Sequence, residues 1–184
     1  SAFRMPDIQV TLYPDIGTQR ILEISLHLPE KQDSLSVRSE DLITLAGQLL
    51  RDNPPAADSY TPGELVSLLE QAASPVDGAG AADPYSALTG QPANLLAHTL
   101  ALELLLQQAG FDVTFVNGMV NGADTCWLIV DAGEGYRHLL LTDETPALYT
   151  DLELTALGYL WNADLYPDCV DYDTALSTTQ TPGE

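Results

Sequence analysis

Few side chains in this sequence could carry covalent or metal chemistry, and they are widely separated. There are two cysteines and three histidines. They are Cys126, Cys169, His27, His98 and His138. A thiolate beside an imidazole can attack a carbonyl carbon, and clustered thiols and imidazoles can hold zinc. Neither cysteine belongs to a CxxC pattern, and the histidines lack the short spacing of a zinc site. The sequence therefore predicts no metal, no cofactor and two buried thiols, with a Cys126–Cys169 disulfide as the alternative.

The charge of the chain restricts its partners. The 184 residues carry 27 acidic and 6 basic side chains, for a net charge of -21. Nucleic acids and anionic membrane surfaces are bound through Lys and Arg, so neither is an expected partner. No apolar run is long enough to cross a membrane, which predicts no direct insertion. The low pI, about 4.1, favours a secreted or surface-displayed bacterial protein over a cytosolic one, which is the alternative. A lipid anchor on a segment outside this chain is one route of attachment.

The N-terminal third is predicted to be a hairpin followed by a helix, both packed on the core. Residues 8–12 and 21–26 alternate between apolar and polar types, which indicates two antiparallel strands. Ser39 is expected to cap a helix that ends before Asn53, because apolar residues recur at helical spacing between them. The predicted boundaries are an N-terminal unit at 1–60, a core at 61–172 and a flexible tail at 173–184.

The elements of the core are bounded by clear capping and turn signals. Thr61, Pro62 and Glu64 form the pattern of a capping box at the start of a helix. Asn94 is a good cap for a second, nearly all-apolar helix that ends at Gly110, so this helix is expected to be buried. A loop is predicted between the helices, at residues 74–84. Three strands are predicted after Gly110, at 112–117, 126–130 and 136–141, with turns at Asn117-Gly118, Asn121-Gly122 and Gly133 to Gly135.

Several short motifs between about residues 60 and 170 occur in an order that is moderately specific. They are Tyr85-Ser86-Ala87-Leu88-Thr89-Gly90, Ala109-Gly110-Phe111, Val116-Asn117-Gly118, Trp127 and Asp143-Glu144-Thr145. In order and spacing they resemble the core of transglutaminase-like proteins. The resemblance implies an α+β, papain-like fold in which a central buried helix packs on an antiparallel sheet, preceded here by a small β-hairpin and helices.

The same resemblance implies where a catalytic triad would lie. In that family a cysteine at the start of the central helix is the nucleophile, a strand histidine moves the proton, and an aspartate orients the histidine. Matching motif to motif puts these positions at Leu95, Thr125 and Asp143, with Asn94 as the alternative to Leu95. Of the three groups only the aspartate is retained, which predicts a pseudoenzyme.

For the remaining reactive side chains, structural roles are favoured over chemical ones. Cys126 follows Thr125 on a strand and so points to the opposite face, which favours a core thiol over a nucleophile. His98 lies one helical turn after Leu95 and could pair with Asp143, but a packing histidine is the favoured interpretation. His138 and His27 are expected at the surface.

Two further groups of residues are candidates for binding. Acidic residues cluster near Cys169 but lack the glycine and terminal glutamate of an EF-hand, so a solvated loop is expected rather than a calcium site. This cluster comprises Asp164, Asp168, Asp171 and Asp173. The residues expected around the former active site are Asn94, His98, Trp127, Tyr85 and Glu144.

These expectations lead to two functional hypotheses. The first is a non-catalytic domain that binds a protein, peptide or glycan, or serves as a scaffold. The alternative is a divergent cysteine-type hydrolase or acyl transferase that uses Cys126 or His98 with Asp143 in a rearranged site. A fold does not determine an activity, so the missing thiol and imidazole favour the first hypothesis.

Overall fold

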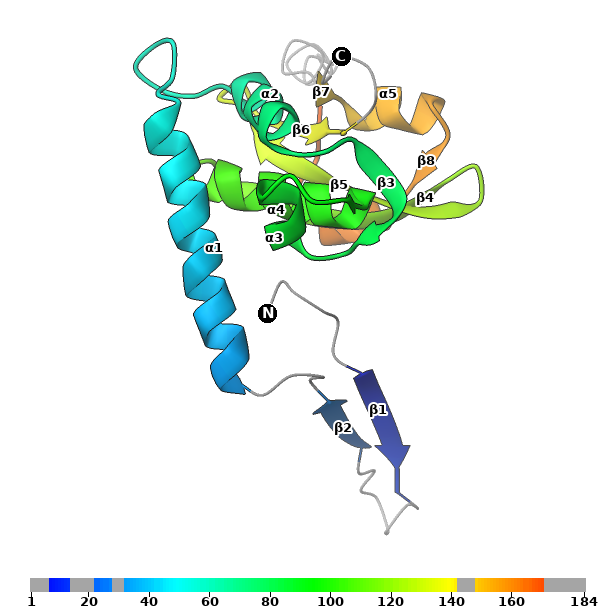
Figure 1. Ribbon diagram of the computed structural model, residues 1–184. Helices are drawn as coiled ribbons and strands as arrows, with labels where there is room; N and C mark the ends of the chain where they lie inside the picture. Colours follow the sequence, from blue (N-terminus) through cyan, green and yellow to red (C-terminus); the bar gives the residue numbers. More distant parts are fainter. Residues whose placement is uncertain (1–6, 14–21, 28–31, 142–147, 171–184) are drawn as a thin grey trace, which may run out of the picture.

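The computed structural model describes residues 7–13, 22–27, 32–141 and 148–170. The described residues form a mixed α+β structure built on an antiparallel sheet, which confirms the general fold class predicted from the sequence (Figure 1). None of the described helices has the length and apolar character needed to cross a bilayer.

The sheet has five strands in the order β7-β6-β5-β4-β8. Strands β4 (Val113–Val120), β5 (Ala123–Asp131) and β6 (Tyr136–Leu139) form the predicted antiparallel meander. On either side of it, β7 (Leu148–Tyr149) pairs with β6 and β8 (Tyr159–Leu160) pairs with β4. The chain therefore returns to both edges of the meander after leaving it.

The turn between β4 and β5 lies at Asn121-Gly122, where both residues have positive φ values of 52° and 79°. A two-residue loop of this kind suits the twist of a hairpin. The turn predicted at Asn117-Gly118 is wrong, since Gly118 lies inside β4. A Cβ at Gly118 would lie 2.6 Å from Trp127 Cζ3 and 2.5 Å from the Leu160 carbonyl oxygen, so glycine is needed for close packing there.

One face of the sheet is covered by α4 (Leu95–Gln108), on which two further helices pack. This central helix is capped by the Asn94 side chain, which accepts from the Ala97 amide at 3.1 Å. The predicted capping box begins α2 (Pro62–Ala72), with Thr61 and Glu64 bonded to each other's main chain. These helices share one apolar core with α1 (Gln32–Asp52) and with side chains such as Leu128 and Val130 of β5.

The opposite face of the sheet carries a second, smaller core. Because strand residues alternate between faces, Trp127 and Ile129 point away from the α4 side. They pack against Leu154 of α5 (Asp151–Ala156) and against the buried side chain of Cys169. The sequence pattern did not predict α5, β7, β8 or the short 3-10 helix η1 (Ala163–Leu165).

Helix α1 begins earlier than predicted, at Gln32, so Ser39 lies within the helix and does not cap it. The buried side chains in its described part are Leu42, Ala46 and Leu50, all in its second half. The apolar periodicity that revealed this helix exists only where it contacts the core. Figure 1 shows its first turns extending past the core, which explains why they were missed.

The predicted hairpin is present as β1 (Asp7–Leu12) and β2 (Leu22–His27). It lies beyond the N-terminal end of α1 in Figure 1, away from the five-stranded sheet. Aliphatic residues lie opposite one another in its register, and Val10 and Ile24 are more than half exposed. Of the predicted unit at 1–60, it is therefore α1 that contributes the buried side chains described here. The predicted tail, 173–184, lies outside the described residues.

The predicted loop at 74–84 contains a strand-like segment, β3 (Val76–Ala81), and leads into the short helix α3 (Pro84–Leu88). Both ends of β3, Val76 and Ala81, bridge to the same residue, Ala93. A Cβ at Gly80 would lie 2.6 Å from the Ala93 main chain, so this glycine permits the close approach. The segment thereby lies against the start of α4.

Candidate functional site

The start of α4 is the position where the resemblance implies a nucleophile. Asn94 caps the helix, and Leu95 is its first residue and is partly exposed. The Thr99 hydroxyl donates to the Leu95 carbonyl oxygen at 2.9 Å, which fixes the first turn. The side chain at this position is thus a leucine held on a rigid helix, with no ionisable group of its own.

The strand residue that faces this turn is Cys126 rather than Thr125. The Cys126 thiol donates to Thr99 Oγ1 at 3.6 Å, and burial raises the pKa of that thiol. Alternation turns Thr125 toward the same face of the sheet as Trp127. The half-buried thiol therefore lies next to a hydroxyl that already donates its own proton to a carbonyl, and this hydroxyl is no base.

Two cavities meet at Leu95 and Val76, which line both. The larger, of about 490 Å³, is lined by apolar residues from α2, the start of β3 and the residues before it, α4 and the chain just after β6. Its polar members are Glu70, Ser74 and His98. The smaller, of about 370 Å³, includes Thr125 and Cys126. Its other lining residues are Val76, Gly78, Asn94, Leu95, Leu96, Asn117 and Asp124. We call the two cavities together the Leu95 groove.

His98 lines the larger cavity and is buried. Its Nδ1 is 2.9 Å from the Asn94 carbonyl oxygen and its Nε2 is 2.9 Å from the Ser74 carbonyl oxygen. Both ring nitrogens thus face main-chain oxygens and neither is directed at Cys126. In this arrangement the imidazole connects Ser74, two residues before β3, with the start of α4.

The structure brings together some of the predicted site residues and separates others. Leu95, Asn94 and Thr125 share the smaller cavity, and His98 adjoins it through Leu95. The expected cleft residue Trp127 lies instead in the core on the opposite face of the sheet, with 1% of its surface exposed. Tyr85, on α3, is 45% exposed and lines neither cavity. Asp143 and Glu144 lie outside the described residues.

The expectation that His138 lies at the surface is wrong, because its side chain is completely buried. Trp127 Nε1 donates to His138 Nδ1 at 2.9 Å, and His138 Nε2 lies 2.8 Å from Asp151 Oδ1. An Nδ1 that accepts from an indole N–H carries no proton, so the neutral ring is protonated at Nε2 and donates to the carboxylate. Burial lowers the pKa of His138, while the hydrogen bond and the charge of Asp151 act in the opposite direction.

Asp151 also connects this histidine to the end of the described chain. Its Oδ2 accepts from the Cys169 amide at 2.9 Å, and its own amide donates to the Cys169 carbonyl oxygen at 2.7 Å. The Cys169 thiol is buried, and this burial raises its pKa to about 12. We refer to Trp127, His138, Asp151 and Cys169 as the indole–imidazole network.

A thiol, an imidazole and a carboxylate lie together in this network, within 4.8 Å of one another. The combination contains metal-binding residue types, but a metal ligand requires an unprotonated ring nitrogen with a free lone pair. His138 Nδ1 accepts from Trp127, and Nε2 carries the proton given to Asp151. For the same reason, neither ring nitrogen of His138 can accept the proton of the Cys169 thiol. The hydrogen bonds therefore give the network a structural role: they fasten α5 and Cys169 to the sheet.

Sequence reasoning missed this network because its members are distant in the sequence and form no motif. One local signal was present. Thr150 and Glu153 form a capping box, with the Glu153 side chain accepting from the Thr150 amide at 2.8 Å. Recognising it would have placed Asp151 in the first turn of a helix.

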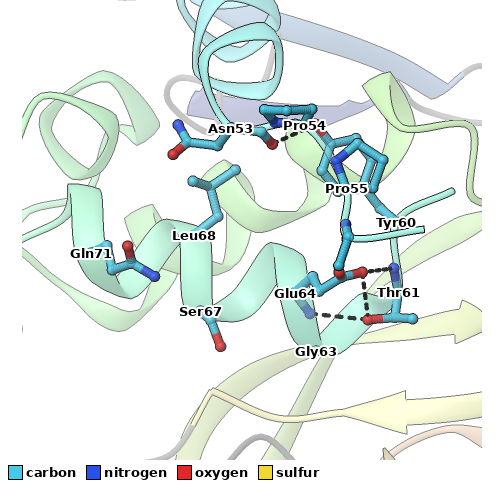
Figure 2. Close-up of a pocket in the computed structure, with 11 residues that line it drawn as sticks. Asn53, Pro54, Pro55, Tyr60, Thr61, Gly63, Glu64, Ser67, Leu68 and Gln71 are labelled. Atoms are coloured by element: carbon cyan, nitrogen blue, oxygen red, sulfur yellow. Dashed lines mark hydrogen bonds between the residues drawn. The ribbon is translucent and has the colours of Figure 1, made fainter. Parts of the chain in front are cut away.

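A third cavity, of about 460 Å³, lies at the corner between α1 and α2 and is shown in Figure 2. Its carboxylate, Glu64, points at Thr61, and its two oxygens accept from the Thr61 and Ala56 amides. The Tyr60 hydroxyl donates to the carbonyl oxygens of Leu50 and Asn53, at 2.7 and 2.8 Å. These polar groups are bonded to main-chain groups of the corner between α1 and α2. The cavity is therefore a weaker candidate for a ligand site than the Leu95 groove.

No protein-family model matches the chain, and no curated protein matches it significantly.

Proposed function

We propose that the protein is a non-catalytic, transglutaminase-like binding domain of a secreted or surface-displayed bacterial protein, and that the Leu95 groove receives its ligand. The observation that carries this proposal is the Leu95 groove itself, which is open at the first turn of α4 while the groups around it lack nucleophile and base chemistry. The ligand class that we favour is a segment of another protein.

The chemistry of the two thiols supports a non-catalytic role. Cys126 is the thiol in the groove, and its pKa is raised, whereas a nucleophilic thiol needs a lowered pKa. His98 turns both ring nitrogens to carbonyl oxygens, and His138 is engaged on the other face of the sheet. The alternative, a hydrolase based on Cys126, would need a base that these contacts do not provide.

The dimensions and walls of the groove support binding. A volume of about 490 Å³ falls within the range of ligand sites, and Leu69, Val76 and Leu141 give the larger cavity an apolar lining with few polar groups. Asn94 and Asn117 supply amide groups in the smaller cavity. A site of this kind suits an apolar side chain followed by main-chain amides.

The distribution of aromatic residues favours a peptide over a glycan. Sugar rings present apolar faces that pack well against the rings of Phe, Tyr and Trp, and none of the described residues lining the groove is of these types. Trp127, Tyr159 and Trp161 are grouped on the opposite face of the sheet, where they contact one another.

Catalysis is tested by thiol modification and turnover. We expect iodoacetamide at pH 7 to modify Cys126 slowly, at a rate below that of free cysteine, and a p-nitrophenyl ester to show no turnover above background. The Cys126→Ser variant is the control for both measurements. Rapid modification together with ester turnover that Cys126→Ser abolishes would establish the hydrolase instead.

Binding is tested by selecting displayed random peptides on the immobilised protein, in parallel with a glycan panel. Selected peptides should lose binding to Leu95→Trp, which fills the groove, and keep it to Leu152→Trp. Leu152 is the matched control because it is 81% exposed on α5 and lines neither cavity. Peptides that bind both variants equally, or ligands found only among the glycans, would contradict the proposal.

A further inference from the structure

The two halves of the Leu95 groove have the same charge character. Glu70 lines the larger cavity and Asp124 lines the smaller one, and both side chains are exposed. The arginines with described side chains are Arg51, at the end of α1, and Arg137, on β6, and neither lines the groove. A ligand that crosses Leu95 therefore meets one carboxylate on each side and no cation among the described lining residues.

The floor between these carboxylates is apolar and open. Leu95 and Val76 line both cavities, and Leu69, Ala73, Pro75 and Leu141 continue the apolar wall beside Glu70. At Gly78, a Cβ would have no atom within 4 Å. The close approach of Ala93 requires a glycine at position 80, whereas no protein contact requires one at position 78. The absence of a side chain at Gly78 leaves room in the smaller cavity.

The groove also offers groups for a peptide main chain. Asn117 lines the smaller cavity, and the first turn of α4 lies at its edge, where main-chain amides carry a partial positive charge. A free anion would be drawn to that turn but repelled by Asp124. A basic peptide suits both the helix start and the carboxylates, because it presents neutral carbonyl oxygens to the helix and cationic side chains to the carboxylates.

We propose that the Leu95 groove binds an extended, basic segment of a partner protein, with an apolar side chain in the larger cavity and Lys or Arg side chains against Glu70 and Asp124. This inference rests on the proposed function and specifies its ligand. A second copy of the chain is a poor occupant, because each copy has a net charge of -21.

Cys126 provides a reporter inside the groove. Its thiol is half-buried in the smaller cavity, whereas the Cys169 thiol is buried with a pKa of about 12. Native-state modification by iodoacetamide thus reports on Cys126. A peptide held in the groove shields this thiol, while a peptide attracted only by the overall charge leaves it accessible.

The first experiment compares two fluorescein-labelled probes, Ala-Lys-Leu-Ala-Lys-Ala amide and its counterpart with Gln at both Lys positions. At 150 mM salt we expect the Lys probe to bind by fluorescence anisotropy and to slow Cys126 modification about tenfold at ten times its Kd, since about a tenth of the sites are then free. The Gln probe should bind about tenfold more weakly. Equal binding of the two probes would overturn the basic preference and leave the proposed function standing.

Paired variants separate the groove from the general acidity of the chain. Glu70→Gln with Asp124→Asn should weaken the Lys probe about threefold for each carboxylate, as expected for exposed ion pairs. Asp164→Asn with Asp168→Asn removes the same charge from exposed residues outside the groove, and we expect a change below about twofold, because salt screens charges beyond a Debye length. Equal effects of the two pairs would overturn the inference.

A steric pair completes the test. Gly78→Leu should fill the smaller cavity and abolish both binding and shielding, while Ala79→Leu, at an exposed residue that lines neither cavity, should leave both unchanged. If Leu95→Trp blocks the probe while Gly78→Leu and the Glu70→Gln, Asp124→Asn variant bind it normally, the groove binds peptides in another way. The inference would then fail while the proposed function stood. If Leu95→Trp has no effect either, both proposals fail. Shielding that grows with protein concentration in the absence of a probe would identify a second copy as the occupant and overturn the inference.

Discussion

The indole–imidazole network can be tested by replacing Asp151 with asparagine. The carboxylate accepts from His138 Nε2 at 2.8 Å through one oxygen and from the Cys169 amide at 2.9 Å through the other. Asparagine has nearly the same shape but only one oxygen, so one of the two donors must face an NH2 group. The substitution thus removes one bond without creating a cavity.

The expected loss follows from the burial of the partners. A hydrogen bond to a charged group contributes about 1.5–3 kcal/mol, and an unsatisfied buried donor costs about 1–3 kcal/mol. The Asp151 side chain is 32% exposed, so water can reach it and relieve part of this cost. We therefore expect about 2 kcal/mol less stability, or a Tm lower by about 4–8 °C for a chain of this size.

Urea denaturation followed by far-UV circular dichroism measures this loss. Asp164→Asn is the matched control, because Asp164 is an exposed aspartate in η1 and its substitution should change stability by less than about 0.5 kcal/mol. If the two variants unfold at the same urea concentration, the network does not hold α5 and Cys169 to the sheet, and its assignment as a structural feature is refuted.

Three further predictions concern packing, capping and pH. Gly118→Ala should destabilise the protein by about 1–3 kcal/mol through its clash with Trp127 and Leu160, whereas Gly63→Ala, with no atom within 4 Å, should be neutral or stabilising in thermal unfolding. Thr61→Ala should cost about 1 kcal/mol in the same assay, because it removes the cap of α2; no change would mean that the Glu64 bonds alone hold the helix start. The pKa of His138 is lower in the folded than in the unfolded state, so its contribution to stability should be complete above about pH 6.5 and should decline as the pH falls toward the folded-state pKa, by at most about 1.4 kcal/mol per pH unit. The difference in unfolding free energy between wild type and His138→Gln should consequently shrink on acidification, and a constant difference from pH 7.5 to 5 would contradict this.

The elements that could be predicted from sequence are those determined by local signals. The capping residues Thr61 and Asn94 begin α2 and α4 as expected, and the turn at Asn121-Gly122 lies where the two residues indicate it. Each of these signals acts within one turn of the chain. The first turns of α1 carried no such signal, because they leave the core and lose the apolar periodicity.

The environment of the strand residues could not be predicted in the same way. Whether His138 is buried depends on α5 and Cys169, which return to the sheet from later parts of the chain. In the candidate site, Leu95 and Thr125 line the same cavity, but the strand side chain that faces the first turn of α4 is Cys126. Trp127 was misplaced because the residue that faces α4 is Cys126, and alternation then turns its neighbour to the opposite face.

The position of the aromatic residues determines what the intrinsic fluorescence of this protein can report. The chain has two tryptophans, and Trp127 and Trp161 contact each other with ring centroids 5.9 Å apart. Both tryptophans therefore belong to the smaller core, on the face of the sheet opposite the Leu95 groove. An emission change will register loosening around α5 and the neighbouring strands, whereas occupation of the groove will be optically silent unless it displaces the sheet. Ligand titrations on this protein consequently need an extrinsic dye or a labelled ligand, and an unchanged tryptophan signal is no evidence that binding has failed.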